Sequence, residues 1–306
     1  MAEKILIIGG TGFLGFHIAK YLIKKRYNVT SVSLHKPVKH RKLTKVQYLI
    51  CDISNKKIIK KKIKKTYTYV INCGGYVNHV DTLQNYKTHY VGVKNLYNVF
   101  KDRNIKNFIQ IGSSLEYGQG IQPNSEEDYC VPKMSYGKFK LKATKYLLEK
   151  NIRHKFPSVI LRFYQLYGPY QDKNRFIPFV ISSCMKGDSF PCSHGKQKRD
   201  FLYISDAVDG VYKAMKSNIS KGKIINLGYG KPVMLKTIIE KIKFKIKQGK
   251  PDYGKIKMRK EEQLINYPNI SVAKNQLKWK SKISILEGLD KTIQYFKKNN
   301  KLNNYD

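Results

Sequence analysis

The sequence predicts an α/β fold in which a doubly wound parallel sheet is followed by a smaller C-terminal lobe. Short runs rich in β-branched residues alternate with amphipathic helical segments over the first half of the chain, as in parallel sheets. A glycine-rich turn directly follows the first predicted strand. From about residue 166 onward, Gly and Pro divide the chain into short elements, so the regular alternation ends there.

The glycine-rich turn lies between a buried strand and an amphipathic helix. Gly9 permits a tight exit from the strand, Gly12 lets the backbone approach a pyrophosphate, and Gly15 lets the helix pack closely on the sheet. Free N–H groups at the start of the helix face an anion. The pattern predicts a Rossmann-type dinucleotide site. Its expected contacts are Gly9, Thr11, Gly12, Phe13, Leu14 and Gly15.

The segments after this helix continue the alternation. Further strands are predicted at 28–33, 46–53, 67–72 and 107–112, where β-branched and aromatic residues concentrate. Apolar spacing predicts helices at 54–65, 83–103 and 135–149. Strands connected by helices in this way form a parallel sheet.

The carboxyl ends of these strands are expected to contact the cofactor, because ligands of open α/β sheets bind there. Ser33 ends the second strand, where such folds place an acidic residue on the ribose. Asp52 ends the third strand near the expected adenine, although an N-cap for the next helix explains Asp52 equally well. The full set is Ser33, His35, Lys36, Asp52, Ile53, Cys73, Gly74 and Gly75.

Tyr136 and Lys140 stand four residues apart and therefore share one face of their helix. In a lysine-rich chain, an ordinary exposed helix face would explain this pair taken alone. Ser113, at the end of the fifth strand, changes the interpretation. A hydroxyl, a phenol and an ammonium can converge there on one carbonyl or alcohol.

The change of pattern near residue 166 sets the predicted domain boundaries. Residues 1–165 form the dinucleotide-binding domain, to which 200–228 return, and residues 166–199 and 229–306 form a substrate-binding lobe. The elements expected in this half are helices at 206–216, 235–247 and 286–298 and a strand at 223–227.

The 306 residues carry a formal net charge of +39. Lysines are spread along the chain and only eight arginines occur, which favours a solvated surface over a nucleic-acid-binding stripe. Such a field attracts anionic small molecules such as sugar nucleotides. The sequence has no run of 18 apolar residues and no secretory leader. Its five cysteines show no paired spacing. We therefore expect a cytoplasmic protein without a membrane span, structural disulfides or bound metal.

Taken in order, the motifs resemble the extended short-chain dehydrogenase/reductase family, which includes sugar-nucleotide epimerases, dehydratases and 4-keto-sugar reductases. The resemblance covers nearly the whole chain. Its motifs are Gly9 to Gly15, Asp52-Ile53, Ser113 to Gly118, Tyr136 with Lys140, Arg162 to Pro169, Phe176 to Pro178, Arg199 to Asp206 and Asn226 to Gly228. It implies NAD(P)-dependent hydride transfer at C4 of a nucleotide-linked sugar, by a 4-keto reductase, 4-dehydrogenase or 4-epimerase. It also implies a homodimer through the helices at 83–103 and 135–149.

The resemblance assigns roles to individual residues. Tyr136 is the acid/base, Lys140 lowers its pKa and holds the nicotinamide ribose, and Ser113 orients the substrate oxygen. A free phenol titrates near ~10, so a fixed cation is needed for it to act as a base near neutral pH. Arg199 and Arg259 bind the diphosphate, because the paired N–H donors of a guanidinium match phosphate oxygens. The alternative is that they are surface arginines. The further substrate contacts are Ser114, Gln165 and Arg175.

Two departures from the family's pattern concern the reaction. Ser114-Leu115 replaces the acidic pair of the dehydratases, so dehydration is disfavoured. His89 replaces an asparagine on the helix behind the active site, and His79 lies near it in the sequence. Either histidine can transfer protons, although a packed, hydrogen-bonded helix residue is the stronger account of His89.

A third departure concerns the cofactor. Ser33 replaces the acidic residue that favours NAD, and His35, Lys36 and Arg41 follow it in a cationic turn. NADP is therefore slightly preferred over NAD. A different class of function, a catalytically silent family member that binds RNA through its basic surface, is the alternative.

Overall fold

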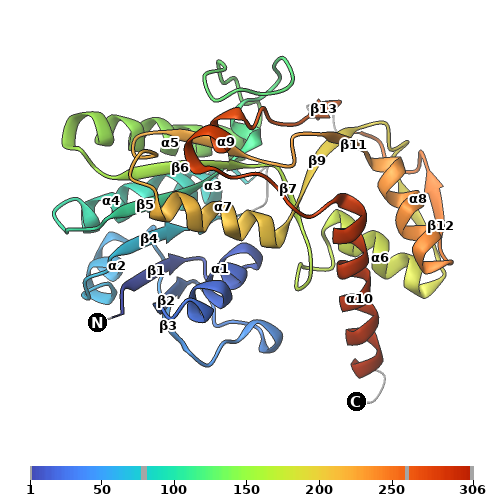
Figure 1. Ribbon diagram of the computed structural model, residues 1–306, viewed down its shortest axis with the longest axis horizontal. Coiled ribbons are helices and arrows are strands. Elements are labelled where there is room, and N and C mark those ends of the chain that lie inside the picture. The colour runs from blue at the N-terminus through green and yellow to red at the C-terminus, as the bar shows by residue number, and fades with distance from the viewer. Residues whose placement is uncertain (1, 77–80, 259–261, 304–306) are drawn as a thin grey trace.

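The computed structural model describes residues 2–76, 81–258 and 262–303. Its largest sheet has seven parallel strands in the order β10-β6-β5-β4-β1-β2-β3 (Figure 1). These strands are β1 (Lys4–Ile8), β2 (Asn28–Ser33), β3 (Val46–Ile50), β4 (Tyr69–Asn72), β5 (Asn107–Ser113), β6 (Ser158–Phe163) and β10 (Ile224–Leu227). The strand order reverses between β1 and β4, which confirms the doubly wound, Rossmann-like fold.

Helices cover both faces of this sheet (Figure 1). On one face α1 (Phe13–Lys24) packs against α7 (Ile204–Lys216). On the other, α4 (Gly92–Phe100) packs against α2 (Lys56–Lys62) and α5 (Ser135–His154). A short helix, α3 (Thr82–Asn85), continues through the π-helical stretch Tyr86–Val91 into α4.

The core lies on both sides of the sheet because alternate residues of a strand point to opposite faces. In β1, Ile5 and Ile7 join the apolar cluster beneath α1 and α7. Leu6 and Ile8 join the second cluster, beneath α4 and α5. A parallel strand covered on both faces reads as a continuous apolar run, which is why this strand was recognisable in the sequence.

Most of the remaining elements form a second, smaller body (Figure 1). A four-stranded sheet consists of β7 (Gln165–Tyr167), β9 (Lys198–Tyr203), β11 (Pro232–Met234) and β13 (Ile265–Asn266), and β8 (Ser189–Cys192) pairs with β12 (Lys250–Tyr253). Helices α6 (Phe176–Lys186), α8 (Leu235–Ile246) and α10 (Ile285–Asn303) pack together, and α9 (Ser271–Leu277) contacts β10 and α7. The strand expected at 223–227 does join the main sheet as β10, whereas β9, at the expected boundary of 200, lies in the smaller sheet.

The N-terminus of α2 differs from one expectation. The side chain of Asn55 caps this helix and accepts hydrogen bonds from the backbone N–H groups of Lys57 and Ile58, each at 3.1 Å. Asp52 instead accepts from the N–H of Ser54 at 2.8 Å, one turn earlier. The N-cap account of Asp52 is therefore wrong, because a second capping side chain lies closer to the helix.

The segment 169–172 joins the two bodies. The ring of His17, on α1, lies 2.9 Å from the carbonyl oxygen of Pro169 through its Nε2. Burial lowers the pKa of His17 to about 4, so the ring is neutral and its Nε2–H donates to that carbonyl. Arg41 is buried, donates through Nε to the carbonyl of Tyr170 at 3.0 Å and pairs with Asp172 at 2.6 Å. Polar contacts thus fix the smaller body against the first helix.

Three further observations concern disulfide bonds, membrane spans and metal ions. All five cysteines are free thiols. None of the helices in the described ranges is long and apolar enough to cross a membrane. Across the same ranges, no group of three His, Cys, Asp or Glu side chains could hold a metal ion.

Candidate active site

The glycine turn lies against the end of β4. Gly9 has a φ of +74°, a left-handed conformation, and a Cβ at this position would come within 2.9 Å of the carbonyl of Cys73. A Cβ on Gly15 would collide with the backbone of Gly9 and Gly10. Gly12 is the N-cap of α1, and no side chain caps this helix, so its first N–H groups are left for an anion. The turn fits a pyrophosphate, as the sequence predicts.

Several of the other predicted cofactor contacts lie near this turn. The hydroxyl of Ser33 is buried at the end of β2 and accepts from the N–H of Thr11 at 3.4 Å. Cys73 and Gly74 face Gly9, and Ile53 packs towards Gly74. His35 and Lys36 are exposed. Arg41, the remaining cation of the expected turn, is already committed to Tyr170 and Asp172.

The three predicted catalytic residues meet between β5 and α5. Lys140 is 5% exposed and donates from Nζ to the carbonyl oxygen of Ile111 at 2.7 Å. Its Nζ lies 5.8 Å from the centre of the Tyr136 ring. Tyr136 is half-buried and hydrogen-bonded to Ser113. The hydroxyl, the phenol and the ammonium therefore share one site.

The protonation of this group differs from what the resemblance implies. Burial raises the pKa of Tyr136 to about 12, and the hydrogen bond to Ser113 offsets only part of that rise. Burial lowers the pKa of Lys140 to about 8. The expected lowering of the phenol's pKa is thus not produced by these side chains alone, because desolvation outweighs it. At neutral pH the phenol keeps its proton and the ammonium keeps most of its charge.

His89 lies in the π-helical stretch directly behind Tyr136. It is 2% exposed, and its ring centre lies 4.9 Å from that of Tyr136 with the planes at 82°. Its Nε2 lies 2.8 Å from the carbonyl oxygen of Tyr76. The packed, hydrogen-bonded account of His89 is confirmed, and its edge-on contact supports the phenol ring. His79 lies outside the described residues.

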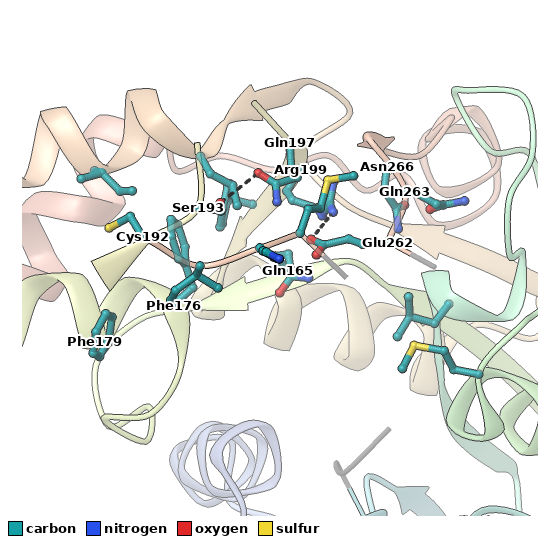
Figure 2. Close-up of a pocket in the computed structure, with 18 of the residues that line it drawn as sticks. Gln165, Phe176, Phe179, Cys192, Ser193, Gln197, Arg199, Glu262, Gln263 and Asn266 are labelled. Atoms are coloured by element: carbon teal, nitrogen blue, oxygen red, sulfur yellow. Dashed lines mark hydrogen bonds and ion pairs between the residues drawn. The ribbon is translucent and has the colours of Figure 1, made fainter. Parts of the chain in front are cut away.

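A cavity of about 450 Å³ opens beside the catalytic group. Leu115 and Gly137, the neighbours of Ser114 and Tyr136, line one end. Most of the rest is lined by the smaller body, with Phe176 and Phe179 towards one end and Arg199, Glu262, Gln263 and Asn266 towards the other (Figure 2). Its apolar lining includes Phe176, Phe179, Leu235 and Ile239, and its polar lining includes Gln165, Gln197, Arg199, Glu262, Gln263 and Asn266. A cavity that combines apolar walls with placed polar groups is typical of ligand sites.

Arg199 is 7% exposed, so the surface role is wrong for this residue. Its guanidinium donates to the carbonyl oxygens of Lys198 at 2.9 Å and Leu264 at 3.3 Å, and it pairs with Glu262 at 2.7 Å (Figure 2). A diphosphate entering the cavity would compete with Glu262 for this fork. Arg259 lies outside the described residues.

The other predicted substrate contacts occupy different parts of the site. Gln165 is exposed and lines the cavity. Arg175 precedes α6, and its charge lowers the pKa of Tyr136, so it acts on the catalytic group. Ser114 is buried and accepts from Nδ2 of Asn266 at 3.3 Å. The roles of Asn266 and Glu262 were missed, and their place shortly after Arg259 was the only signal in the sequence.

A sequence model described as the NAD dependent epimerase/dehydratase family matches residues 5–228. The chain belongs to this family. The resemblance to the extended short-chain dehydrogenases and reductases is therefore confirmed, and with it an NAD-dependent family of nucleotide-sugar enzymes.

Individual relatives span the whole chain. CDP-abequose synthase of Salmonella muenchen is 27% identical over 95% of this chain and 97% of its own length. The dTDP-D-glucose 4,6-dehydratase of Mus musculus is 26% identical over 97% and 90%, respectively. UDP-glucose 4-epimerase of Thermotoga maritima, solved with UDP-glucose, superposes with a TM-score of 0.90 at 23% identity over 97% of this chain and 99% of that one. Their names cover different reactions, so the comparisons leave the chemistry at C4 unspecified.

Replacement of Arg199 by Ala is predicted to weaken nucleoside diphosphate binding by about tenfold or more and to leave NAD binding unchanged. A charge-assisted hydrogen bond contributes about 1.5–3 kcal/mol, and the lost fork faces the cavity rather than the glycine turn. Titration calorimetry with UDP and with NAD measures both affinities. The control is Arg153→Ala, which removes an exposed arginine paired with Glu149. Unchanged UDP affinity in Arg199→Ala would place the diphosphate elsewhere.

Proposed function

We propose that the protein transfers a hydride between C4 of a nucleotide-linked sugar and a nicotinamide cofactor, as a 4-keto reductase, 4-dehydrogenase or 4-epimerase. The observation that carries this proposal is the grouping of Ser113, Tyr136 and Lys140 at the end of β5. Cys73, which faces Gly9 in the glycine turn, is close enough to Lys140 for its charge to affect the lysine's pKa. The catalytic group therefore lies between the cofactor turn and the cavity.

The bound cofactor would supply the hydride donor or acceptor and, when oxidised, a cationic ring. The chain's own residues handle the proton. In the reductive direction, the neutral phenol of Tyr136 donates its proton to the oxygen at C4 as negative charge develops there. In the oxidative direction, the ionised phenolate of Tyr136 accepts the proton of the C4 hydroxyl. The charge of Arg175 lowers the pKa of this phenol, and the Lys140 ammonium, 5.8 Å from the centre of the ring, also favours the ionised form. Ser113 holds the phenol oxygen and orients the substrate oxygen beside it.

The side chains of the turn after β5 do not favour dehydration. Ser114 and Leu115 carry no carboxyl group, and the nearest acid in this turn, Glu116, is fully buried in an ion pair with Arg162 at 3.0 Å. Elimination of water from the sugar requires one group to abstract a proton and another to deliver one. The turn offers neither to the cavity.

We also propose a cellular compartment and an oligomeric state for the protein. We place the enzyme in the cytoplasm, since its five cysteines are free. We propose a homodimer through the helical segments 83–103 and 135–149, where the partly exposed rings of Tyr86 and Tyr90, in the π-helical stretch, and of Tyr146, in α5, lie in contact with their neighbours. The alternative, a catalytically silent family member that binds RNA, has less support because all three residues of the catalytic group are present.

Replacement of Tyr136 by Phe is predicted to lower kcat by about 10²–10⁴-fold with little change in nucleotide-sugar affinity, since only the transferred proton is lost. Turnover is measured with UDP-glucose and with dTDP-, CDP- and GDP-linked hexoses and their 4-keto forms, as a change in cofactor redox state for a reductase or dehydrogenase and as inversion at C4 for an epimerase. Tyr212→Phe, on α7 and packed against Tyr21 away from the site, is the control. A Tyr136→Phe variant with more than about a tenth of the wild-type rate would assign the proton to another group, such as His89.

For the cofactor, we propose a slight preference for NADP. Ser33 carries no charge to repel a 2′-phosphate, and His35 and Lys36 are exposed beside it. Ser33→Asp is therefore predicted to weaken NADP binding by about tenfold relative to NAD binding, through like-charge repulsion. Dissociation constants for both cofactors, with Thr44→Asp as an equal change in charge on an exposed loop, provide the measurement. Equal or tighter NADP binding by the Asp variant would show that Ser33 does not face the 2′ position.

A further inference from the structure

Glu116 lies directly beneath the catalytic group and is fully buried. Each of its carboxylate oxygens is engaged. Oε1 accepts from the backbone N–H of Ser113 at 2.8 Å. Oε2 accepts from the hydroxyl of Thr144 at 2.8 Å and from Nε of Arg162 at 3.0 Å. One side chain therefore connects the end of β5, helix α5 and strand β6.

Thr144 places this connection on the catalytic face of α5. Tyr136, Lys140 and Thr144 follow one another at intervals of four residues, so they lie along one side of the helix. Each is bound to the end of β5 or the turn after it. Tyr136 bonds to Ser113, Lys140 donates to Ile111, and Thr144 donates to Glu116. The Thr144 contact is the third of three hydrogen bonds that hold α5 against the end of β5 and the turn after it.

The bond from the Ser113 N–H to Glu116 also completes a capping box around the turn Ser114–Glu116. A glutamine completes such a box as well as a glutamate does, so capping does not require a charged residue here. A buried ion pair is about as stabilising as apolar side chains of similar volume, because desolvation offsets the attraction. The pair also restricts its neighbours. A Cβ on Gly112 would come within 2.7 Å of Oε1 of Glu116, and the Arg162 guanidinium lies 4.3 Å from the centre of the Tyr117 ring. What the carboxylate provides beyond packing is a fixed, directional link between Ser113 and α5.

We propose that Glu116 is a positioning residue, whose carboxylate sets the distance and alignment between the Ser113 hydroxyl and the Tyr136 phenol for proton transfer. The inference rests on the proposed function, since it concerns the same reaction. A misplacement of about 1 Å can lower an enzymatic rate by about 10²-fold, so a link of this kind affects turnover more than binding.

The negative charge of Glu116 also affects the pKa values of the groups that it positions. Glu116 raises the pKa of Tyr136 and of Lys140. The other groups that face Tyr136 are Ser113 on β5, Lys140 on α5, His89 on the π-helical stretch and Arg175 before α6. Cys73 and the carbonyl of Ile111 face Lys140. Removal of this negative charge lowers the pKa of the phenol, so the phenol ionises at lower pH.

The first test removes the link and keeps the charge. Thr144→Val preserves the volume of the side chain and deletes the hydroxyl that bonds Glu116. It is expected to lower kcat about tenfold, with unchanged nucleotide-sugar affinity and an unmoved pH profile, and Thr144→Ser is expected to recover the rate to within about twofold. The control is Thr292→Val, which deletes another buried hydroxyl, bonded to Gly288 in α10.

The second test removes the charge. Glu116→Gln is expected to move the ascending limb of the oxidative kcat profile to lower pH by about one unit. Wild-type kcat in Thr144→Val, a loss that Thr144→Ser does not recover, or an unmoved profile in Glu116→Gln would each overturn the inference while the proposed function stands. A wild-type enzyme that transfers no hydride to or from any nucleotide sugar would overturn both.

Discussion

The close approach of the glycine turn to the end of β4 is the constraint on which the site depends. Gly9 is in a left-handed conformation against Cys73, and α1 packs on the turn through Gly15. No larger residue fits either position. The approach sets the start of α1 over the point where the strand order reverses, which is where open α/β sheets bind ligands. Lys140, bonded to Ile111 on the next strand, lies beside the same crevice.

Burial determines which proton transfers the site favours. Desolvation raises the pKa of Tyr136 and lowers that of Lys140, so the protein alone keeps the phenol as a proton donor. Use of the same phenol as a base requires more positive charge nearby, which Arg175 supplies in part. Tyr136 thus acts as an acid in one direction and as a base in the other, in a reaction in which the redox state of the cofactor decides the direction of proton transfer.

Local patterns made much of this structure predictable. The apolar runs, the glycine spacing and the four-residue interval of Tyr136 and Lys140 are local, and strand ends of a parallel sheet meet at one edge. Other features depend on contacts between distant residues. Glu116 pairs with Arg162 on β6, and Glu262 pairs with Arg199, 63 residues earlier in the chain. Asp52 is not the cap because α2 begins at Lys56, where Asn55 accepts from the N–H groups of the first turn, and propensity alone does not rank two such candidates.

The most direct test of the account follows the hydrogen at C4. The enzyme is incubated with its preferred nucleotide sugar, or the reduced form of its 4-keto sugar, carrying deuterium at C4, and with excess oxidised cofactor. Mass spectrometry then locates the label. The account predicts that deuterium passes directly to the nicotinamide ring and does not appear in water, because the proposed reaction is hydride transfer at that carbon. If the enzyme is a 4-epimerase, the cofactor returns this label to C4 of the inverted sugar, so deuterium is then found on the nicotinamide ring or on the inverted C4. Deuterium released to water, or retained on a C4 of unchanged configuration while the sugar is converted, would contradict hydride transfer at that carbon.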